Sequence, residues 1–175
     1  MTLLFTMIML LFAGQSRAEA QGISRADTLL AAKKHFSFAV QYKKNGDYTD
    51  ALRQYEKSIA LNDTVFQVHF SFAELLMLMN LQERAKAEYL RTLALNPEHY
   101  ASASLLAGMY YHAALYDSAL VMYETMHRIK QEPSTLTGIA RLREYLGKKR
   151  EALDALRMLI DQGELSKENL TGAAK

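Results

Sequence analysis

The sequence predicts an all-α protein made of repeated pairs of antiparallel helices, and three observations support this. The 175 residues include only two prolines and eight glycines, which disfavours an all-β protein with many tight turns. The pentapeptide His-Phe-Ser-Phe-Ala occurs at residues 35–39 and again at residues 69–73, an offset of 34. Within each copy, apolar residues recur at spacings of three and four, the period of a helix.

The composition excludes several other classes of protein. The absence of cysteine excludes a disulfide scaffold, a cysteine nucleophile, a thiolate metal site and a lipid-modified N-terminal cysteine. Positive and negative side chains are nearly balanced, with 21 Lys and Arg against 19 Asp and Glu. Such a chain has no strong field that would attract nucleic acid, so no nucleic-acid partner is expected.

Residues 1–20 are predicted to be a signal peptide. Thr2 to Ala13 is almost continuously apolar, but shorter than the roughly 20 residues that a membrane-spanning helix needs. Ala18-Glu19-Ala20 then has the small-x-small form that signal peptidases recognise. We expect cleavage after Ala18 or Ala20 and a periplasmic or secreted protein with no stable membrane span. Because no Lys or Arg precedes the apolar run, two alternatives stay open: an uncleaved segment that tethers the chain to a membrane, or an internal apolar helix.

Four consecutive pairs of helices are predicted after this segment. They occupy residues 32–65, 66–99, 100–132 and 133–165, the last with a one-residue slip. Before them, residues 21–31 contain Ser24 and Asp27, which form a capping box and start the first helix early. Asn45-Gly46-Asp47 separates the first two helices, because Gly takes the left-handed conformation at a helix end at little cost. Residues 166–175 form a short C-terminal tail.

Small residues recur where the two helices of each pair are expected to cross. These residues are Ala39, Ala73, Ala107 and Ala140 on first helices and Ala51, Ala85, Ala119 and Ala152 on second helices. Only a small side chain fits at a close crossing, so all of them should be buried. Tyr55, Tyr89 and Tyr123 are expected to fill the space between layers with their hydroxyls at the edge. Pro97 and Pro133 are expected at helix starts, where a missing N–H is harmless.

Two signatures mark the turns between helices. Asn45-Gly46-Asp47-Tyr48 is followed by Ala51 and Tyr55, and the second copy ends in Ala94-Leu95-Asn96-Pro97. This pattern resembles the tetratricopeptide repeat family over about residues 32–165. The resemblance implies an all-α, right-handed superhelix, a solenoid of about four helix-turn-helix repeats. The chain departs from the family at His35 and His69, where Trp or Leu is usual, at Asn80-Leu81, where Gly-Asp is usual, and at Arg143, which occupies an aromatic position.

The resemblance also implies a binding surface, because the first helices of this family line a concave groove that holds an extended or helical peptide. Carried over to this sequence, the groove-facing positions are Lys33, Phe36, Val40, Lys43, Phe70, Glu74, Met77, Ser104, Tyr111, His112 and Arg141. We expect an apolar-anchored peptide site with cationic edges at Lys33, Lys43 and Arg141. Packing of the apolar members against neighbouring layers stays open as the alternative.

One binding mode of the family is not expected. Members that clamp the C-terminal carboxylate of heat-shock chaperones use Lys, Asn and Arg on their first helices. The matching positions here are Phe36, Val40, Ala101 and Leu105. The side chains that such a clamp needs are therefore missing.

No catalytic or metal-binding motif occurs in the sequence. It contains no Gly-rich phosphate loop, no G-x-S-x-G elbow and no H-E-x-x-H pair. His35 and His69 are interpreted as packing residues with a satisfied ring nitrogen, since no carboxylate is spaced with them, although a metal shared between them stays open. We expect neither an enzyme nor a cofactor.

The predicted function is a non-catalytic repeat scaffold or adaptor that binds a protein or peptide partner in the bacterial cell envelope. The alternative is an accessory or regulatory subunit of an enzyme or export system whose active site is on another chain. A cytoplasmic or membrane-tethered co-chaperone is a third, if the N-terminal segment is not cleaved. Exposure of Leu153, Leu156, Met158 and Leu159 is also expected to allow self-association through the C-terminal repeat.

Overall fold

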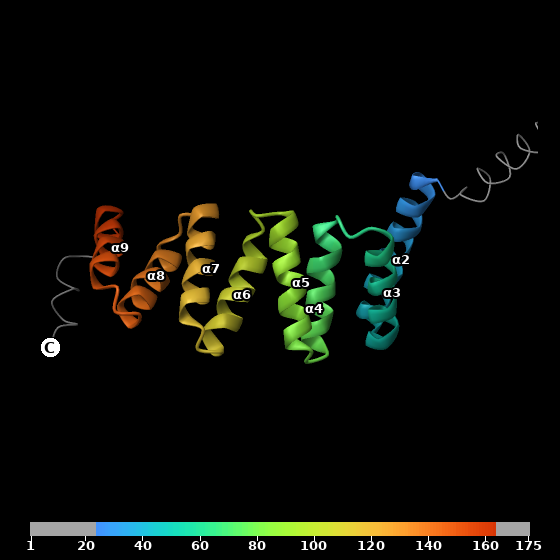
Figure 1. Cartoon of the computed structure of the whole chain (residues 1–175), viewed down its shortest axis with the longest axis horizontal. Coiled ribbons are helices and arrows are strands. Elements are labelled where there is room, and N and C mark those ends of the chain that lie inside the picture. The colour runs from blue at the N-terminus through green and yellow to red at the C-terminus, as the bar shows by residue number, and fades with distance from the viewer. Residues whose placement is uncertain (1–23, 164–175) are drawn as a thin grey trace, which may run out of the picture. The chain divides into compact units, whose positions relative to one another are not determined.

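The computed structural model describes residues 24–163, and all the regular structure in this range is α-helical (Figure 1). The prediction of an all-α protein is confirmed. The chain divides into two compact units between Asp63 and Thr64. No helix within residues 24–163 is long and apolar enough to cross a membrane. The predicted signal peptide and the predicted tail, residues 166–175, lie outside the described residues.

The first unit is one pair of helices. They are α2 (Arg25–Asn45) and α3 (Tyr48–Leu61). The predicted capping box begins α2: Ser24 Oγ accepts the N–H of Asp27 at 3.3 Å, and the Asp27 carboxylate accepts the N–H of Ser24 at 3.2 Å. The hydroxyl of Ser58 donates to the carbonyl of Ala32 at 2.9 Å and ties α3 to α2. This bond satisfies a polar group in a buried interface.

The second unit is a row of three further pairs (Figure 1). Its helices are α4 (Phe66–Leu78), α5 (Gln82–Leu95), α6 (Tyr100–His112), α7 (Tyr116–Ile129), α8 (Pro133–Tyr145) and α9 (Lys149–Asp161). The helices of each pair pack together, and successive pairs contact each other through α5 and α6 and through α7 and α8. Short connections place sequential helices side by side, as in other helical repeats.

The two prolines lie in different settings. Pro133 is the first residue of α8, as predicted. The prediction for Pro97 is wrong, because this residue lies in the turn before α6. There the N–H of His99 donates to the carbonyl of Asn96 at 3.1 Å. Pro97 is the second residue of this turn, a position that its fixed φ suits.

The alanines predicted at the helix crossings are all buried. None of them exposes more than 6% of its surface. Since alanine is the smallest residue that still favours a helix, it lets two helix backbones approach closely without a loss of helix propensity. The spacing of small residues in the sequence therefore located the contact face of every helix pair.

The repeated tyrosines are more deeply buried than expected. Tyr55 and Tyr89 are buried, so the prediction that their hydroxyls reach an edge is wrong. The ring of Phe36 lies 6.1 Å from that of Tyr55, and the ring of Phe70 lies 5.8 Å from that of Tyr89. These phenylalanines cover the tyrosines. Burial, with a smaller contribution from the charge of Glu74, raises the pKa of Tyr89 to about 12.

His99 joins two layers of the second unit. Its ring centroid lies 5.4 Å from that of Phe66 and 4.6 Å from that of Phe70, both on α4. Its Nδ1 accepts the backbone N–H of Ser102 at 3.3 Å and thereby caps α6. Burial lowers the pKa of His99. The neutral form that can accept this bond is therefore favoured.

The turn between the helices of each pair contains one residue in the left-handed region. These residues are Gly46 (φ 87°), Asn80 (φ 59°), Ala114 (φ 57°) and Gly147 (φ 74°). The residue after each donates its N–H to the carbonyl five residues earlier, for example Leu115 to Tyr110 at 2.9 Å. This is the Schellman closure of a helix end. The departure from Gly at Asn80 is mild, because Asn tolerates this conformation, whereas Ala114 is strained.

Replacing Ala114 by Gly should relieve that strain. We expect Ala114→Gly to raise the free energy of unfolding by roughly 0.5–1 kcal/mol, because a left-handed conformation costs a non-glycine residue about 1–2 kcal/mol and the added flexibility of the unfolded chain offsets part of the gain. Ala113→Gly is the matched control: Ala113 is exposed and has φ −82°, so glycine there should lower stability. Urea denaturation measures both variants, and equal stabilities would contradict the strain.

Candidate functional site

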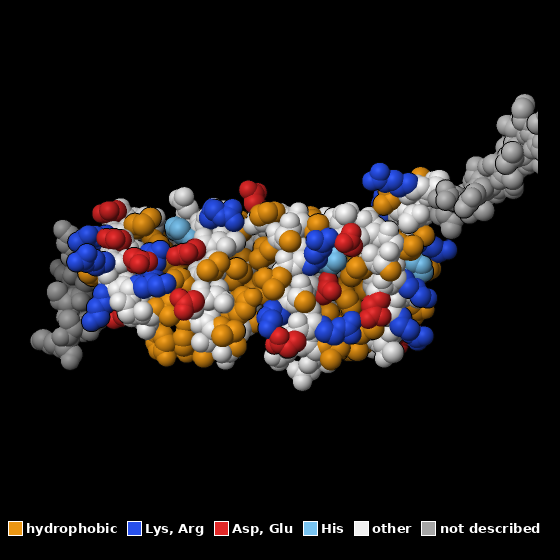
Figure 2. All heavy atoms as spheres, in the orientation of Figure 1, with side chains coloured by type: hydrophobic (Ala, Val, Ile, Leu, Met, Phe, Trp, Pro, Cys, Tyr) orange, Lys and Arg blue, Asp and Glu red, His pale blue; other side chains and the backbone are white. Residues whose placement is uncertain are grey.

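The surface of the second unit has two hollows lined mainly by apolar side chains. In Figure 2, hydrophobic side chains gather between α5 and α6 and at the lower ends of α7 and α8. One hollow, the methionine pocket, has a volume of about 500 Å³. The other, the tyrosine cleft, has a volume of about 290 Å³. Ligand sites of proteins are typically concave and apolar with a few polar groups, as both hollows are.

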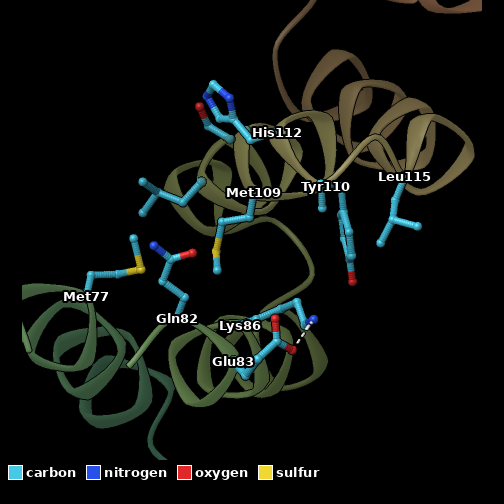
Figure 3. Close-up of a pocket in the computed structure, with 12 residues that line it drawn as sticks. Met77, Gln82, Glu83, Lys86, Met109, Tyr110, His112 and Leu115 are labelled. Carbon is cyan, nitrogen blue, oxygen red and sulfur yellow. Dashed lines mark hydrogen bonds and ion pairs between the residues drawn. The ribbon is translucent and has the colours of Figure 1, made fainter. Parts of the chain in front are cut away.

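The methionine pocket opens between the end of α4, the first half of α5 and the outer side of α6. It is lined by Met77, Gln82, Glu83, Lys86, Ser104, Leu105, Gly108, Met109, Tyr110, His112, Ala113 and Leu115. Figure 3 shows Met77 and Met109 on opposite sides of the pocket, with Gln82 between them. Thioether side chains are flexible and polarisable, so such a wall adapts to different apolar ligands.

The charges of this pocket neutralise each other. Glu83 pairs with Lys86 along α5, and this hydrogen bond raises the pKa of Lys86 (Figure 3). On the facing helix, Ser104 and Gly108 provide no bulk, and a Cβ at Gly108 would meet nothing within 4 Å. The pocket therefore has open apolar space, and the charges of Glu83 and Lys86 compensate each other. Such a space suits an apolar side chain of a partner.

The tyrosine cleft lies where the ends of α6 and α8 meet α7. It is lined by Tyr111, Tyr116, Tyr123, Gly138, Arg141, Leu142 and Tyr145. The ring centroid of Tyr116 lies 5.6 Å from that of Tyr111 and 4.3 Å from that of Tyr145. A hydrogen bond between the hydroxyls of Tyr116 and Tyr145 raises the pKa of Tyr116. A phenol hydroxyl can donate a hydrogen bond to a ligand.

The structure divides the predicted groove residues of the second unit among three places. Met77, Ser104 and His112 line the methionine pocket, and Tyr111 and Arg141 line the tyrosine cleft. Phe70 is half-buried against Tyr89 and His99, so for this residue the packing alternative applies. Glu74 is half-buried on the same helix.

The remaining groove residues belong to the first unit, on α2. Lys33 and Val40 are exposed. Phe36 is half-buried against Tyr55, and Lys43 is half-buried near the end of the helix. A site that combines these four residues with those of the second unit stays a prediction.

Several residues of the two hollows escaped the sequence analysis. Met109 lines the methionine pocket, and Tyr116 and Tyr145 line the tyrosine cleft. Leu105, which the sequence placed only at a position of the heat-shock clamp, also lines the methionine pocket. Tyr116 lies on a second helix and Tyr145 at the end of α8, outside the positions that the family resemblance supplies. The available signal was the gathering of Tyr111, Tyr116 and Tyr145 at helix ends, because a group of at least partly exposed aromatic residues is informative where a single one is not.

The histidine prediction needs one correction. His35 Nδ1 lies 2.7 Å from Gln54 Oε1, and His69 Nδ1 lies 2.7 Å from Glu88 Oε2, so the ring nitrogens are satisfied as predicted. The statement that no carboxylate is spaced with these histidines is wrong, because Glu88 reaches His69 from the second helix of the pair. No group of three His, Asp or Glu side chains within residues 24–163 could hold a metal ion.

The four apolar side chains of α9 that were expected to be exposed differ in their burial. Leu153 and Met158 are exposed and Leu156 is half-buried. The prediction is wrong for Leu159, which exposes only 1% of its surface because it packs into the core formed by α7 and α8. Self-association through this helix stays a prediction.

Known structures share this architecture. The chain is similar to MamA from AMB-1, at 16% identity over 91% of this chain and 93% of that one, with a TM-score of 0.60. It is also similar to the Arabidopsis OM64 TPR domain, at 13% identity over 67% and 98% of the two chains, with a TM-score of 0.55. The chain has the tetratricopeptide-repeat fold.

A third structure with the tetratricopeptide-repeat fold has a ligand. It is the first TPR of Spaghetti (RPAP3) bound to the HSP90 peptide SRMEEVD, at 15% identity over 67% of this chain and 94% of that one, with a TM-score of 0.55. No family model matches the sequence, and no curated protein sequence matches it. At these identities the likeness shows the fold alone.

Gly108 in the methionine pocket and Gly138 in the tyrosine cleft have different surroundings. Substituting each by alanine therefore tests how tightly its neighbours pack. A Cβ at Gly138 would lie 2.4 Å from Cε1 of Tyr123, whereas Gly108 has open space. We expect Gly108→Ala to raise the free energy of unfolding by about 1 kcal/mol through helix propensity. Gly138→Ala gains the same helix propensity but must displace a packed ring, which costs about 1–3 kcal/mol, so its free energy of unfolding should lie about 1–3 kcal/mol below that of Gly108→Ala.

Thermal and urea denaturation measure both glycine variants. Equal stabilisation by the two substitutions would show that Tyr123 does not hold its position against Gly138. The far-UV circular dichroism of both variants should match that of the native chain, because neither glycine has a positive φ.

Proposed function

We propose that this chain is a non-catalytic scaffold that binds a protein or peptide partner through the hollows of its second unit. The observation that carries the proposal is the methionine pocket, an open apolar hollow of about 500 Å³ in a tetratricopeptide-repeat fold. Stacked helical repeats present extended surfaces of this kind to partners. The peptide-bound TPR of Spaghetti (RPAP3) supports the same class of function.

The exposed side chains of the methionine pocket favour a partner with apolar anchors. Met77, Leu105 and Leu115 are all exposed, although each is large and apolar. Covering such side chains stabilises a complex by about 25 cal/mol for each Å² removed from water. Single exposed leucines are ordinary, but several around one hollow indicate an interaction surface.

The partner should differ from the HSP90 peptide bound by Spaghetti (RPAP3). Val40 and Leu105 are apolar and exposed at positions where a carboxylate clamp needs polar or charged side chains. Ala101, also exposed, can form no ion pair. The surface therefore supports recognition by apolar contact at these positions rather than capture of a terminal carboxylate.

A charge placed in the methionine pocket should weaken partner binding. Leu105→Glu puts a carboxylate where an apolar anchor of the partner would be buried. Because an uncompensated buried polar group costs at least about 1–3 kcal/mol, recovery of a crosslinked partner should fall roughly tenfold or more. Leu90→Glu is the matched control, because Leu90 on α5 is 41% exposed against 40% for Leu105 and does not line either hollow. Quantitative mass spectrometry of crosslinked complexes from the source cells gives the measurement.

The comparison of these two variants decides the proposal. Loss with Leu105→Glu and retention with Leu90→Glu supports binding through the pocket. Equal recovery from the native chain and both variants, or equal loss with both, would place the partner elsewhere or show that no specific partner binds.

We extend the proposal to the cell envelope, on the basis of the apolar segment Thr2 to Ala13 and the cleavage-site pattern Ala18-Glu19-Ala20. The full-length gene expressed in a bacterial host should give a mature chain that begins at Glu19 or Gln21 and fractionates with the periplasm or medium. Intact-mass spectrometry and fractionation test this. A chain that retains Met1 in the cytoplasmic fraction would contradict it.

A further inference from the structure

We propose that the tyrosine cleft binds an acidic, extended segment of the partner, with a carboxylate of that segment paired to Arg141 and a neighbouring apolar side chain packed against Tyr111 and Tyr145. This inference deepens the proposed function and rests on it, because it names the chemistry of one part of the partner. It does not use the positions of the heat-shock clamp, since Arg141 is not among them.

The charge of Arg141 has no counter-charge among the described residues. Arg141 is exposed, lines the cleft and takes part in no ion pair or hydrogen bond with the residues that the structure describes. Its neighbour Arg143 is neutralised: one guanidinium nitrogen lies 2.8 Å from Glu124 Oε1, and Nε lies 3.7 Å from Glu151 Oε2. A guanidinium without a counter-charge presents a planar set of donors that matches a carboxylate.

The wall of the tyrosine cleft also favours an anionic group. The lining of the cleft includes no acidic side chain, so nothing in it competes for Arg141. Elsewhere on the second unit, Lys148 Nζ lies 3.4 Å from Asp117 Oδ1, so the charges of these two residues also compensate each other. The phenol of Tyr111 adds a hydrogen-bond donor to this wall, whereas the hydroxyls of Tyr116 and Tyr145 are hydrogen-bonded to each other. A guanidinium and a phenol donor with no carboxylate beside them in the lining favour an anionic ligand group.

The aromatic rings of the tyrosine cleft pack against one another. Tyr116 lies between Tyr111 and Tyr145, with interplanar angles of 73° and 59°. The missing Cβ of Gly138 lets Tyr123 close the floor of the cleft. Because the rings already pack against each other, little side-chain freedom is lost when a ligand binds. Aromatic faces also give a large contact area for few rotatable bonds.

The size of the cleft favours an extended ligand. Its volume of about 290 Å³ lies at the lower end of the roughly 300–1,000 Å³ typical of ligand sites. This space accepts individual side chains, not a whole helix of about 10 Å diameter. An extended segment places alternate side chains on one face, so an acidic residue can meet Arg141 while a nearby apolar residue meets the tyrosine rings.

A random library of short peptides displayed on phage tests the inference with the full mature chain as bait. We expect the selected peptides to be enriched in Asp and Glu beside an apolar residue. Arg141→Gln should remove the acidic enrichment and weaken binding of a selected peptide about tenfold or more, as expected for loss of a charge-assisted hydrogen bond. Arg128→Gln is the matched control, because Arg128 on α7 is exposed, has no described ion pair and lines neither hollow.

Substitutions of Tyr145 test the aromatic part. Tyr145→Ala should weaken the same peptide, whereas Tyr145→Phe, which keeps the ring, should retain most of the affinity. Tyr145 is 69% exposed, so both variants should fold, with circular dichroism as the check.

The outcomes separate the inference from the function it rests on. Enriched peptides without acidic residues, or acidic peptides that bind equally to Arg141→Gln, would overturn the inference and leave the scaffold function standing. A library from which no peptide is enriched, together with no pocket-dependent partner in the crosslinking experiment, would overturn both.

Discussion

The close approach of two helices within each pair is the constraint on which the rest of the structure depends. Buried alanines at equivalent positions of α2 to α9 make this approach sterically feasible. Once the pairs are closed, Tyr55 and Tyr89 become buried beneath Phe36 and Phe70. The chain thus uses the same small and large residues repeatedly, and each pair is one unit of packing.

The turns within helix pairs and the junctions between pairs are stabilised by different interactions. Within each pair, a left-handed residue lets the following N–H reach back to the first helix, and this conformation is kept whether the residue is Gly, Asn or Ala. At the α4 to α6 junction, His99 caps α6 while its ring packs against two phenylalanines of α4. At α7 to α8, Gly138 admits the ring of Tyr123. The small residues Ser104 and Gly108 leave space in the methionine pocket, whereas the tyrosine cleft lies where Gly138 admits the ring of Tyr123.

Local signals explain why much of the fold could be predicted. The capping box at Ser24, the turn at Gly46 and the helix start at Pro133 each depend on a few neighbouring residues, so the sequence alone located them. Pro97 was misplaced because a proline suits both the first turn of a helix and the second position of a turn. The hydrogen bond from His69 to Glu88 joins two helices, and no short spacing could have revealed that it exists.

The sequence by itself determined the helical class, the repeat period and the face of each helix that is buried, because these follow from periodicity and from the size of side chains at fixed spacing. Tertiary structure decided which of the predicted groove residues line a hollow. Phe70 and Tyr111 occupy first-helix positions predicted to face the same groove, yet Phe70 packs against His99 and Tyr111 lines a cleft. The physical reason is that a hollow depends on what neighbouring helices leave unfilled, and on which charges find partners across them. Arg141 and Arg143 are close in the sequence, but only the packing of α7, α8 and α9 leaves one paired and the other open to a ligand.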